Sequence, residues 1–432
     1  MMTPDYSPGE DHVAFTEWSL AQGVIANGVA PARFPGRGLG MIATQKIKKG
    51  DAVVQVPTSI IFTVDDVPFD FKAQFSEGTA VQTIMAAFLT LGSDEELEKY
   101  QLWFKAWPSR KDFEDSLPLL WPMELGGLIW PDTIAPEGAT DGACNTTNLL
   151  PPCISGLWNS IERLPRIKKY ETEHQDLESA QGERLRKAWA DTIAAFPEAD
   201  WTSFSYYWLI LNTRSFYWVG AGQDPPENRN DAMALLPFAD YFNHSNVECD
   251  VKFDENEYTL RATDDYDKGD EVYMSYGSHP NDFLLAEYGF FLEKNDSDCI
   301  YLDEIVLGDL DNHEKHEELW LNQYYGEYRV TRQGVCYRTE VAACLKYMNY
   351  KDWTNHILKG STKGLDEKKS EDIIKGWLGA YVSEANITMT AIRGALESNA
   401  VVQSHHEKAE VLLRRWAQIK DICECASKAV SL

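Results

Sequence analysis

Four polar side chains gather within six residues of an otherwise apolar segment: Asp240, Asn243, His244 and Ser245. A carboxylate, an amide, an imidazole and a hydroxyl can together hold a zwitterionic ligand through directed hydrogen bonds. A polar turn that satisfies its own groups would use the same residue types. Taken alone, the two interpretations have about equal weight.

Two tyrosines downstream of this segment are each followed by glycine, at Tyr276 and Tyr288. A tyrosine hydroxyl can orient an amine, and the face of its ring attracts a cation. Two aromatic side chains of the core would leave the same pattern, so each tyrosine alone is only a candidate.

Far upstream, Gly36, Gly38 and Gly40 alternate with other residues. Such glycines let the backbone approach a ligand closely and adopt positive φ. The pattern is not the G-x-G-x-x-G of dinucleotide-binding folds, and no long helix follows it. A plain turn at the entry to a strand is the simpler explanation when this motif is taken alone.

The cysteines and histidines predict no metal site. The eight cysteines contain no C-x-x-C pair, and Cys423 and Cys425 have no further ligands nearby. One such pair cannot complete a tetrahedral zinc site. His313 and His316 lie in a run of charges that is typical of a solvated helix.

The composition describes a globular protein with an acidic surface. The chain has 432 residues, 40 basic and 68 acidic, for a net charge of −28. This balance disfavours nucleic-acid binding, since phosphates need basic partners, and it suits a basic protein partner. No stretch approaches the roughly 20 apolar residues of a membrane helix, and the first residues lack the pattern of a secretory signal. We expect a monomer in the cytoplasm, the nucleus or both.

The elements that would position these motifs form two β-rich segments separated by helices. β texture covers about residues 36–63 and 232–291, helical texture covers 79–107 and 154–195, and the chain after 292 is helical. We therefore predict four parts: 1–65 and 201–292 as two halves of one β core, 66–200 as a helical insertion, and 293–432 as a helical domain.

The order of the three motifs resembles that of the SET-domain methyltransferases, and most closely the branch typified by the Rubisco large-subunit lysine methyltransferase. The resemblance covers about residues 15–65 and 200–292, and it rests on Gly38-Leu39-Gly40, Thr213 to Phe216, Pro237 to Ser245 and Asn281 to Phe290. It implies an α+β fold, with a split all-β SET core, a helical insertion and an all-α C-terminal domain that recruits the protein substrate.

The resemblance also implies a cofactor, S-adenosyl-L-methionine, and residues that bind it. Arg37, Gly38 and Leu39 are expected to contact it through the backbone, and Arg214 to pair with its carboxylate. The remaining cofactor residues implied by the resemblance are Asn243, His244, Tyr288 and Phe290.

On the substrate side, the resemblance places a carboxylate at Asp240 and the catalytic tyrosine at Tyr276. Methyl transfer needs a neutral amine, whereas an unperturbed lysine has a pKa of about 10.4. A narrow apolar channel would lower that pKa by desolvation and align the nitrogen. Tyr276 would orient the nitrogen, and no metal is needed.

The chain departs from the family pattern at two places, one expected to bind the substrate lysine and one expected to contact the cofactor. Family members often carry a further substrate tyrosine after the Asn-His-Ser segment, where this chain has Val251 and Phe253, with Tyr258 further on. Arg37 stands where relatives can have an acidic residue.

The predicted activity is methylation of lysine in a non-histone protein, such as a ribosomal protein or a translation factor. One alternative is methylation of histidine, as in a relative that acts on actin and lacks a tyrosine at the position of Tyr288. The other is an inactive SET module that binds a protein partner.

Overall fold

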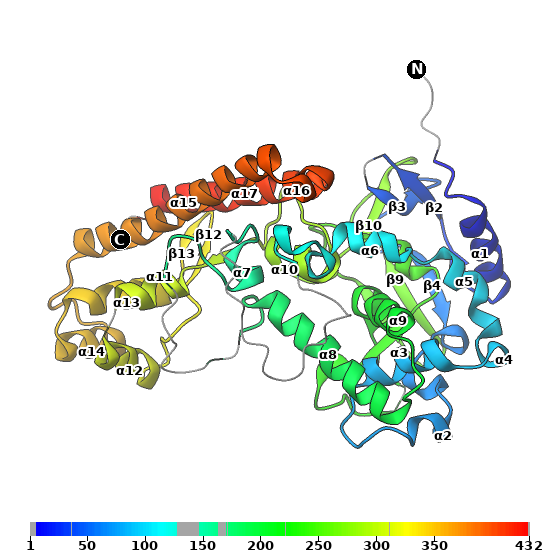
Figure 1. The fold of residues 1–432 in the computed structure, drawn as a ribbon. Helices are drawn as coiled ribbons and strands as arrows, with labels where there is room; N and C mark the ends of the chain where they lie inside the picture. The colour runs from blue at the N-terminus through cyan, green and yellow to red at the C-terminus, as the bar shows by residue number, and fades with distance from the viewer. Residues whose placement is uncertain are drawn as a thin grey trace. The chain divides into compact units, whose positions relative to one another are not determined.

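The structure is a computed structural model that describes residues 6–35, 37–127, 147–162, 170, 172–220, 222–310 and 312–430. The described chain divides into two compact units, one of residues 1–113 and 183–278 and the other of residues 114–182 and 279–432. Figure 1 shows the course of the chain. The four-part division made from the sequence stays a prediction.

The first unit combines short strands with a group of helices. Two helices, α6 (Arg110–Ser116) and α8 (Leu177–Ala195), begin in one unit and end in the other. The other elements of the first unit are α1 (Glu10–Ala21), β1 (Ile25–Ala26), β2 (Val29–Phe34), β3 (Gly38–Ala43), β4 (Ala52–Pro57), α2 (Phe69–Lys72), α3 (Val81–Leu91), α4 (Asp94–Leu97), α5 (Gln101–Ala106), α9 (Trp201–Arg214), β5 (Ser215–Tyr217), β6 (Met233–Leu235), β7 (Asn243–His244), β8 (Val251–Phe253), β9 (Glu257–Arg261) and β10 (Glu271–Met274).

Two four-stranded sheets join the two β-rich segments of the sequence. One sheet has the order β1-β4-β9-β8, and the other has the order β2-β3-β10-β7. In the second sheet, β10 pairs antiparallel with β3, with Glu271 opposite Ile42, and parallel with β7, with Tyr273 opposite Asn243. This pairing brings the glycine motif, the Asn-His segment and the strand before Tyr276 to one place.

The helix α9 leads into the second β segment, and a capping residue fixes its start. Asp200 caps α9, since its Oδ2 accepts a hydrogen bond from the backbone N–H of Ser203 at 2.8 Å. The helix ends at Arg214, and the chain continues directly into β5. Arg214 is thereby placed at the helix end beside the second β segment.

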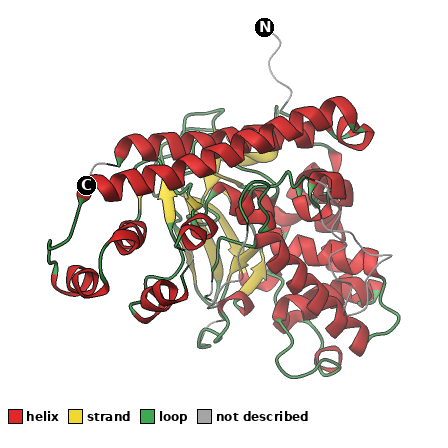
Figure 2. Cartoon of the chain, turned by 60° about the vertical axis from the view of Figure 1, so that its left-hand side comes forward, coloured by secondary structure: helices red, strands yellow, loops and turns green. Residues whose placement is uncertain are grey.

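The second unit is mainly helical. Its elements are α7 (Pro152–Ser155), α10 (Asn281–Tyr288), β11 (Ile300–Tyr301), α11 (Asp303–Asp309), α12 (His313–Leu321), β12 (Arg329–Thr331), β13 (Gly334–Val335), α13 (Tyr337–Tyr347), α14 (Tyr350–Lys359), α15 (Glu367–Ser398), α16 (Ala400–Ser404) and α17 (His406–Ala429). The long helices α15 and α17 run side by side in both views (Figures 1 and 2).

The core of this unit is built on the apolar faces of these helices. Trp353 and Trp416 are completely buried. The indole N–H of Trp416 donates to the carbonyl of Leu149 at 2.8 Å, which satisfies its polar atom. The core thus joins the C-terminal helices to the chain segment that precedes α7.

The predicted fold class is confirmed, with two local differences. Asn281–Tyr288 is a helix, where the sequence texture suggested β structure. The C-terminal region, predicted to be all helical, also contains the three-stranded sheet β11-β12-β13. Its strands have two or three residues each, too few to show a period in the sequence.

Candidate active site

The glycine motif opens β3 and lies against buried polar side chains. Gly38 has φ +76°, a left-handed conformation that glycine adopts without strain. A Cβ on Gly40 would lie 2.6 Å from Glu271 Oε1 and 2.7 Å from Asn243 Nδ2. Only glycine therefore permits this approach of β3 to the neighbouring strands. Gly36 lies outside the described residues.

The side-chain amide of Asn243 has a defined orientation. Its Nδ2 donates to the carbonyl of Leu39 at 2.8 Å and to Glu271 Oε1 at 2.7 Å. Both acceptors lack a hydrogen to donate, so the amide nitrogen has to face them. The amide oxygen of Asn243 is consequently directed elsewhere, as an acceptor suited to an ammonium group.

Arg37 is anchored to the same carboxylate. Its Nη1 lies 2.9 Å from Glu271 Oε2 and also donates to the hydroxyl of Tyr273. That hydroxyl donates in turn to Glu271 Oε2 at 2.9 Å. Burial and the neighbouring Glu271 raise the pKa of Tyr273 to about 12, so it stays protonated at neutral pH. The side chain of Arg37 remains 55% exposed, whereas that of Glu271 is 3% exposed.

Glu271 is the residue of this site that sequence analysis missed. Its carboxylate connects Arg37 with Asn243, residues that are far apart in the sequence. The sequence predicts only a hairpin turn, Asp267 to Asp270, in front of it. Its partners become visible only when β10 is paired with β3 and β7.

Tyr276 and His244 form a second polar pair. The hydroxyl of Tyr276 donates to the carbonyl of Phe242 at 2.6 Å, and its backbone N–H donates to His244 Nδ1 at 3.0 Å. His244 Nδ1 thus acts as an acceptor. The two rings stack with centroids 5.2 Å apart. The hydroxyl hydrogen of Tyr276 is therefore directed to the carbonyl, and its oxygen can act as an acceptor toward a bound amine.

Arg214 and Asp240 form a third, partly buried group. Arg214 Nη1 donates to the carbonyl of Asp240 at 2.9 Å and to its Oδ2 at 3.2 Å. The indole N–H of Trp103 also donates to Asp240 Oδ2, at 3.3 Å. Burial raises the pKa of Asp240, while Arg214 opposes that shift. The residue predicted for the cofactor carboxylate and the one predicted for the substrate side are thus direct partners.

Tyr288 and Phe290 belong to the second unit and are described within it. Tyr288 ends α10, and its ring centroid lies 6.3 Å from that of Phe290. Burial raises the pKa of Tyr288 to about 12. Between them, Gly289 has φ +80°, and a Cβ there would lie 2.7 Å from Ser116 Cβ. This glycine is required for the turn that sets the two rings.

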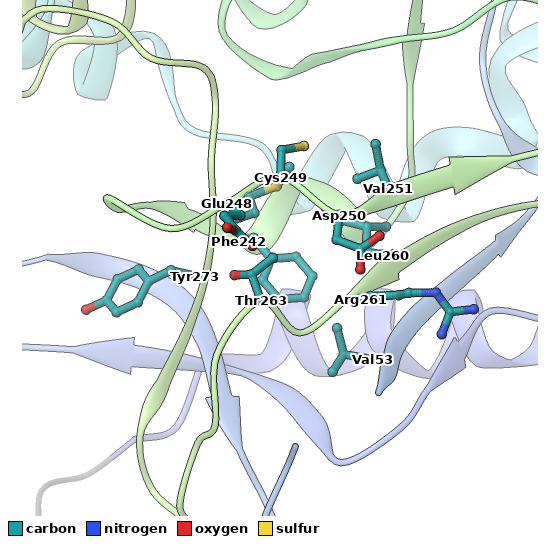
Figure 3. A pocket seen from close by; sticks show the side chains of 11 residues that line it. Val53, Phe242, Glu248, Cys249, Asp250, Val251, Leu260, Arg261, Thr263 and Tyr273 are labelled. Atoms are coloured by element: carbon teal, nitrogen blue, oxygen red, sulfur yellow. The ribbon is translucent and has the colours of Figure 1, made fainter. Parts of the chain in front are cut away.

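A small, partly open pocket is lined by Phe242, whose carbonyl accepts the hydrogen bond from the Tyr276 hydroxyl. Figure 3 shows Phe242 and Thr263 at its centre, with the ring of Tyr273 pointing away from them. Its other lining residues are Val53, Glu248, Cys249, Asp250, Val251, Leu260, Arg261 and Met274. The lining combines apolar side chains with polar ones, among them Glu248 and Asp250 from the loop before β8.

The described residues fit a zwitterionic cofactor in the first unit. The close backbone approach at Gly38 to Gly40, the outward amide oxygen of Asn243 and the guanidinium of Arg214 offer it a cradle, an acceptor and a cation. Across the described ranges, no group of three or more His, Cys, Asp or Glu side chains is arranged to hold a metal ion. No helix in the described part of the chain combines the length and the apolar character needed to cross a membrane.

Comparison with known proteins identifies the same family. The model of the SET domain matches residues 38–277, more than half of the chain. Human SET domain-containing protein 4 is 24% identical over 396 residues, which cover 88% of this chain and 83% of that protein. The ribosomal lysine N-methyltransferase set11 of Schizosaccharomyces pombe is 28% identical over 227 residues, covering 49% of this chain and 57% of its own length.

Solved structures confirm the fold. The SET domain of LSMT bound to methyl-lysine and AdoHcy aligns with a TM-score of 0.56 at 16% identity, covering 98% of this chain and 94% of that one. Rubisco LSMT bound to sinefungin and monomethyl-lysine aligns with a TM-score of 0.58 at 15% identity, covering 97% and 91%. The comparisons do not test the roles of the individual site residues, which stay predictions.

Proposed function

Because the chain belongs to the SET-domain family, we propose that it is an S-adenosylmethionine-dependent protein-lysine N-methyltransferase. S-adenosylmethionine is the methyl donor of this family. The ribosomal lysine methyltransferase among its relatives supports a basic ribosomal protein or a translation factor as the substrate. The net charge of −28 supports a basic partner in the same way. The proposal includes a monomeric enzyme that works in the cytoplasm, the nucleus or both.

The orientation of Tyr276 is the observation that carries this proposal. Its hydroxyl hydrogen points to the carbonyl of Phe242, and stacking on His244 limits the motion of the ring. An amine that approaches the phenol oxygen from the other side would meet an acceptor. Such a contact orients the nitrogen, and fixed orientation supplies much of the rate of a displacement reaction.

The substrate lysine has to be neutral before it can accept a methyl group. Its unperturbed pKa is about 10.4, so it arrives as an ammonium. Met274 ends β10, the strand that leads to Tyr276, and it lines a pocket together with Phe242; both side chains are apolar. Apolar surroundings disfavour the charged form, lower the pKa of the amine and release the proton to solvent. When bound, S-adenosylmethionine supplies a methyl group that is already activated on a sulfonium.

The experiment is methylation of a fractionated proteome from the protein's own cells with tritiated S-adenosylmethionine. We expect a labelled basic protein whose hydrolysate contains methyl-lysine. Tyr276→Phe should lower the rate about a hundredfold. Tyr206→Phe is the matched control, because that hydroxyl also donates to a backbone carbonyl, that of Pro108, but lies outside the site.

Other outcomes would overturn the proposal in distinguishable ways. Methyl-histidine in the hydrolysate would assign the histidine activity instead. A Tyr276→Phe variant that labels as fast as the wild type would remove the role of that hydroxyl. Calorimetry that detects no binding of S-adenosylmethionine, together with absent labelling, would identify a SET module that only binds a partner.

A further inference from the structure

Three aromatic side chains at the end of β5 and on β8 form a partly exposed cluster in the first unit. We call Tyr217, Trp218 and Phe253 the aromatic surface. The ring of Phe253 lies 6.2 Å from that of Tyr217 and 5.2 Å from that of Trp218, between centroids. Tyr217 is 42% exposed, and the other two are half-buried. An aromatic cluster whose faces reach solvent differs from an ordinary core.

The aromatic surface rests on a rigid base. Tyr258 of β9 is 2% exposed, and its ring stacks on that of Phe253 with centroids 5.5 Å apart. Phe216 also contacts Tyr258, at 6.0 Å between centroids. The backbone of Trp218 is held by a hydrogen bond from its N–H to the carbonyl of Ala232 at 3.1 Å. The rings are thus held in place before any ligand arrives, which lowers the entropic cost of binding.

The hairpin that carries Phe253 adds negative charge. We call Asp254 and Glu255, in the turn between β8 and β9, the acidic turn. Lys252 points to the opposite face of β8, because side chains alternate along a strand. Phe253 and the two carboxylates of the acidic turn therefore lie on one hairpin. Ring faces and carboxylates favour the same kind of ligand, a cation.

A cation of the chain itself already lies over one of these rings, that of Tyr217. The guanidinium carbon of Arg229 is 5.9 Å from the centroid of the Tyr217 ring. This distance is within the range of a cation–π contact. The aromatic surface thus accepts a guanidinium group in the described structure.

The surface is connected to the candidate active site along β8. Val251 lines the pocket with Phe242, whose carbonyl accepts the hydroxyl of Tyr276. Phe253 lies two residues further on the same face of the strand, about 7 Å along it. A polypeptide segment that reached Tyr276 could therefore also reach the aromatic surface.

We propose that the aromatic surface and the acidic turn together bind an arginine or lysine side chain of the protein substrate, a few residues from the methylated position. This inference rests on the proposed function, because it names the sequence context that the enzyme selects. The occupant is a basic segment of a protein, since the site offers ring faces and carboxylates to one cationic side chain.

The test uses two fluorescein-labelled heptapeptides, Gly-Arg-Gly-Lys-Gly-Arg-Gly and Gly-Ala-Gly-Lys-Gly-Ala-Gly, and the full chain. Fluorescence anisotropy gives their dissociation constants. We expect the arginine peptide to bind about three- to fivefold tighter, as one exposed cation–π contact would provide. Trp218→Ala should abolish this ratio, whereas Trp218→Tyr, which keeps a ring face, should retain it.

Two further variants separate the site from a general effect. Phe69→Ala removes an aromatic ring of the same unit that is 78% exposed and lies outside the surface, so the ratio should not change. Arg229→Ala removes the resident cation, so the arginine peptide should bind more tightly. A Trp218→Ala variant that still prefers the arginine peptide, or an Arg229→Ala variant that binds it more weakly, would overturn the inference.

The readout also distinguishes this inference from the proposed function. Transfer of a tritiated methyl group to the central lysine is measured on the same peptides. Binding that prefers arginine, without transfer, would retain the aromatic surface as a docking site and contradict the enzymatic activity. Transfer to both peptides at equal rates and affinities would retain the activity and contradict the docking site.

Discussion

Two arginine–carboxylate clusters, one in each unit, use the same chemical groups in opposite ways. In the first unit, Arg37 pairs with Glu271 and keeps 55% of its side chain exposed. In the second unit, Arg415 of α17 pairs with Asp282 of α10 at 2.7 Å and with Asp298 at 2.7 Å, and its side chain is 0% exposed. The first cluster orients the Asn243 amide at the candidate cofactor site, whereas the second holds α17 against α10.

The two clusters differ in how much negative charge stays without a partner when the arginine is removed. Burial works against the charge of Arg415, but Asp282 and Asp298 outweigh that effect and raise its pKa further above the usual value. Without Arg415, two carboxylates would remain in the interior with no cation between them. Without Arg37, the carboxylate of Glu271 still accepts hydrogen bonds from Asn243 and Tyr273. Similar clusters therefore predict very different mutational effects.

The largest effect is expected for Arg415→Met. Removing one partner of a buried ion pair costs about 3–5 kcal/mol, because the remaining charge is left uncompensated. For a unit of this size, we expect a fall in melting temperature of roughly 10 °C. Differential scanning calorimetry measures it. Arg414→Met is the matched control, because its pair with Glu293 is exposed on both sides and such pairs contribute little. Equal shifts in the two variants would remove the distinction between buried and exposed clusters.

The next largest effect is expected for Glu271→Gln, on the binding of S-adenosylmethionine. The glutamine keeps the size of the side chain but loses the charge that attracts Arg37 and holds Asn243. Hydrogen bonds to a charged group contribute about 1.5–3 kcal/mol. We expect the dissociation constant for S-adenosylmethionine, measured by calorimetry, to rise at least tenfold.

Tyr273→Phe is the control for Glu271→Gln. It removes one donor to Oε2 and leaves the contact of Oε1 with Asn243 intact. Its cofactor affinity should stay close to that of the wild type. If Glu271→Gln binds S-adenosylmethionine normally, the amide of Asn243 does not need this carboxylate for its orientation.

A smaller effect is expected for Arg37→Ala. The exposed guanidinium forms a pair that contributes about 0–1 kcal/mol, and the predicted cofactor contact at this position is through the backbone. We expect less than a threefold change in the dissociation constant of S-adenosylmethionine. A loss of thirtyfold or more would instead show that the side chain itself contacts the cofactor.

Local elements of the fold were predictable, because each depends on neighbouring residues. The β-rich run Ala52 to Pro57 predicts a strand, which is observed as β4. The aromatic-rich run from Trp201 to Phe216 predicts a helix, which is observed as α9 (Trp201–Arg214). Its last two expected residues belong to β5 instead, since Ser215 and Phe216 pair with β6. That pairing joins segments separated by a loop, and no local pattern reveals it.

The same limit applies to the site. Asn243, His244 and Tyr276 stand out in the sequence, because short polar and aromatic motifs are visible there. Glu271 does not stand out, since a glutamate after a turn is ordinary and its role comes from pairing across the sheet. The aromatic surface was missed for the same reason, because its rings come from two strands about 35 residues apart in the sequence.

The smallest expected effect is a dependence of stability on pH. One histidine in each unit allows the two units to be compared. Burial lowers the pKa of His12 in the first unit and of His174 in the second. The unfolded chain, with histidine pKa values near about 6.5, then binds more protons than the folded chain. The folded protein is therefore most stable above about pH 6.5, and it loses this part of its stability as the pH falls below that value. We expect a melting temperature a few degrees lower at pH 5.5 than at pH 7.5.

Single variants assign that loss to one unit or the other. His12→Gln removes the titrating group that contacts the hydroxyl of Tyr241 at 2.9 Å, so it should reduce the acid-induced shift of the first unit. His174→Gln should do so for the second unit. His313→Gln, on the exposed side of α12, is the control and should leave the shift unchanged. If neither the His12 nor the His174 variant alters the shift, the acid limit of the protein is set by its carboxylates, and the two units do not differ in this respect.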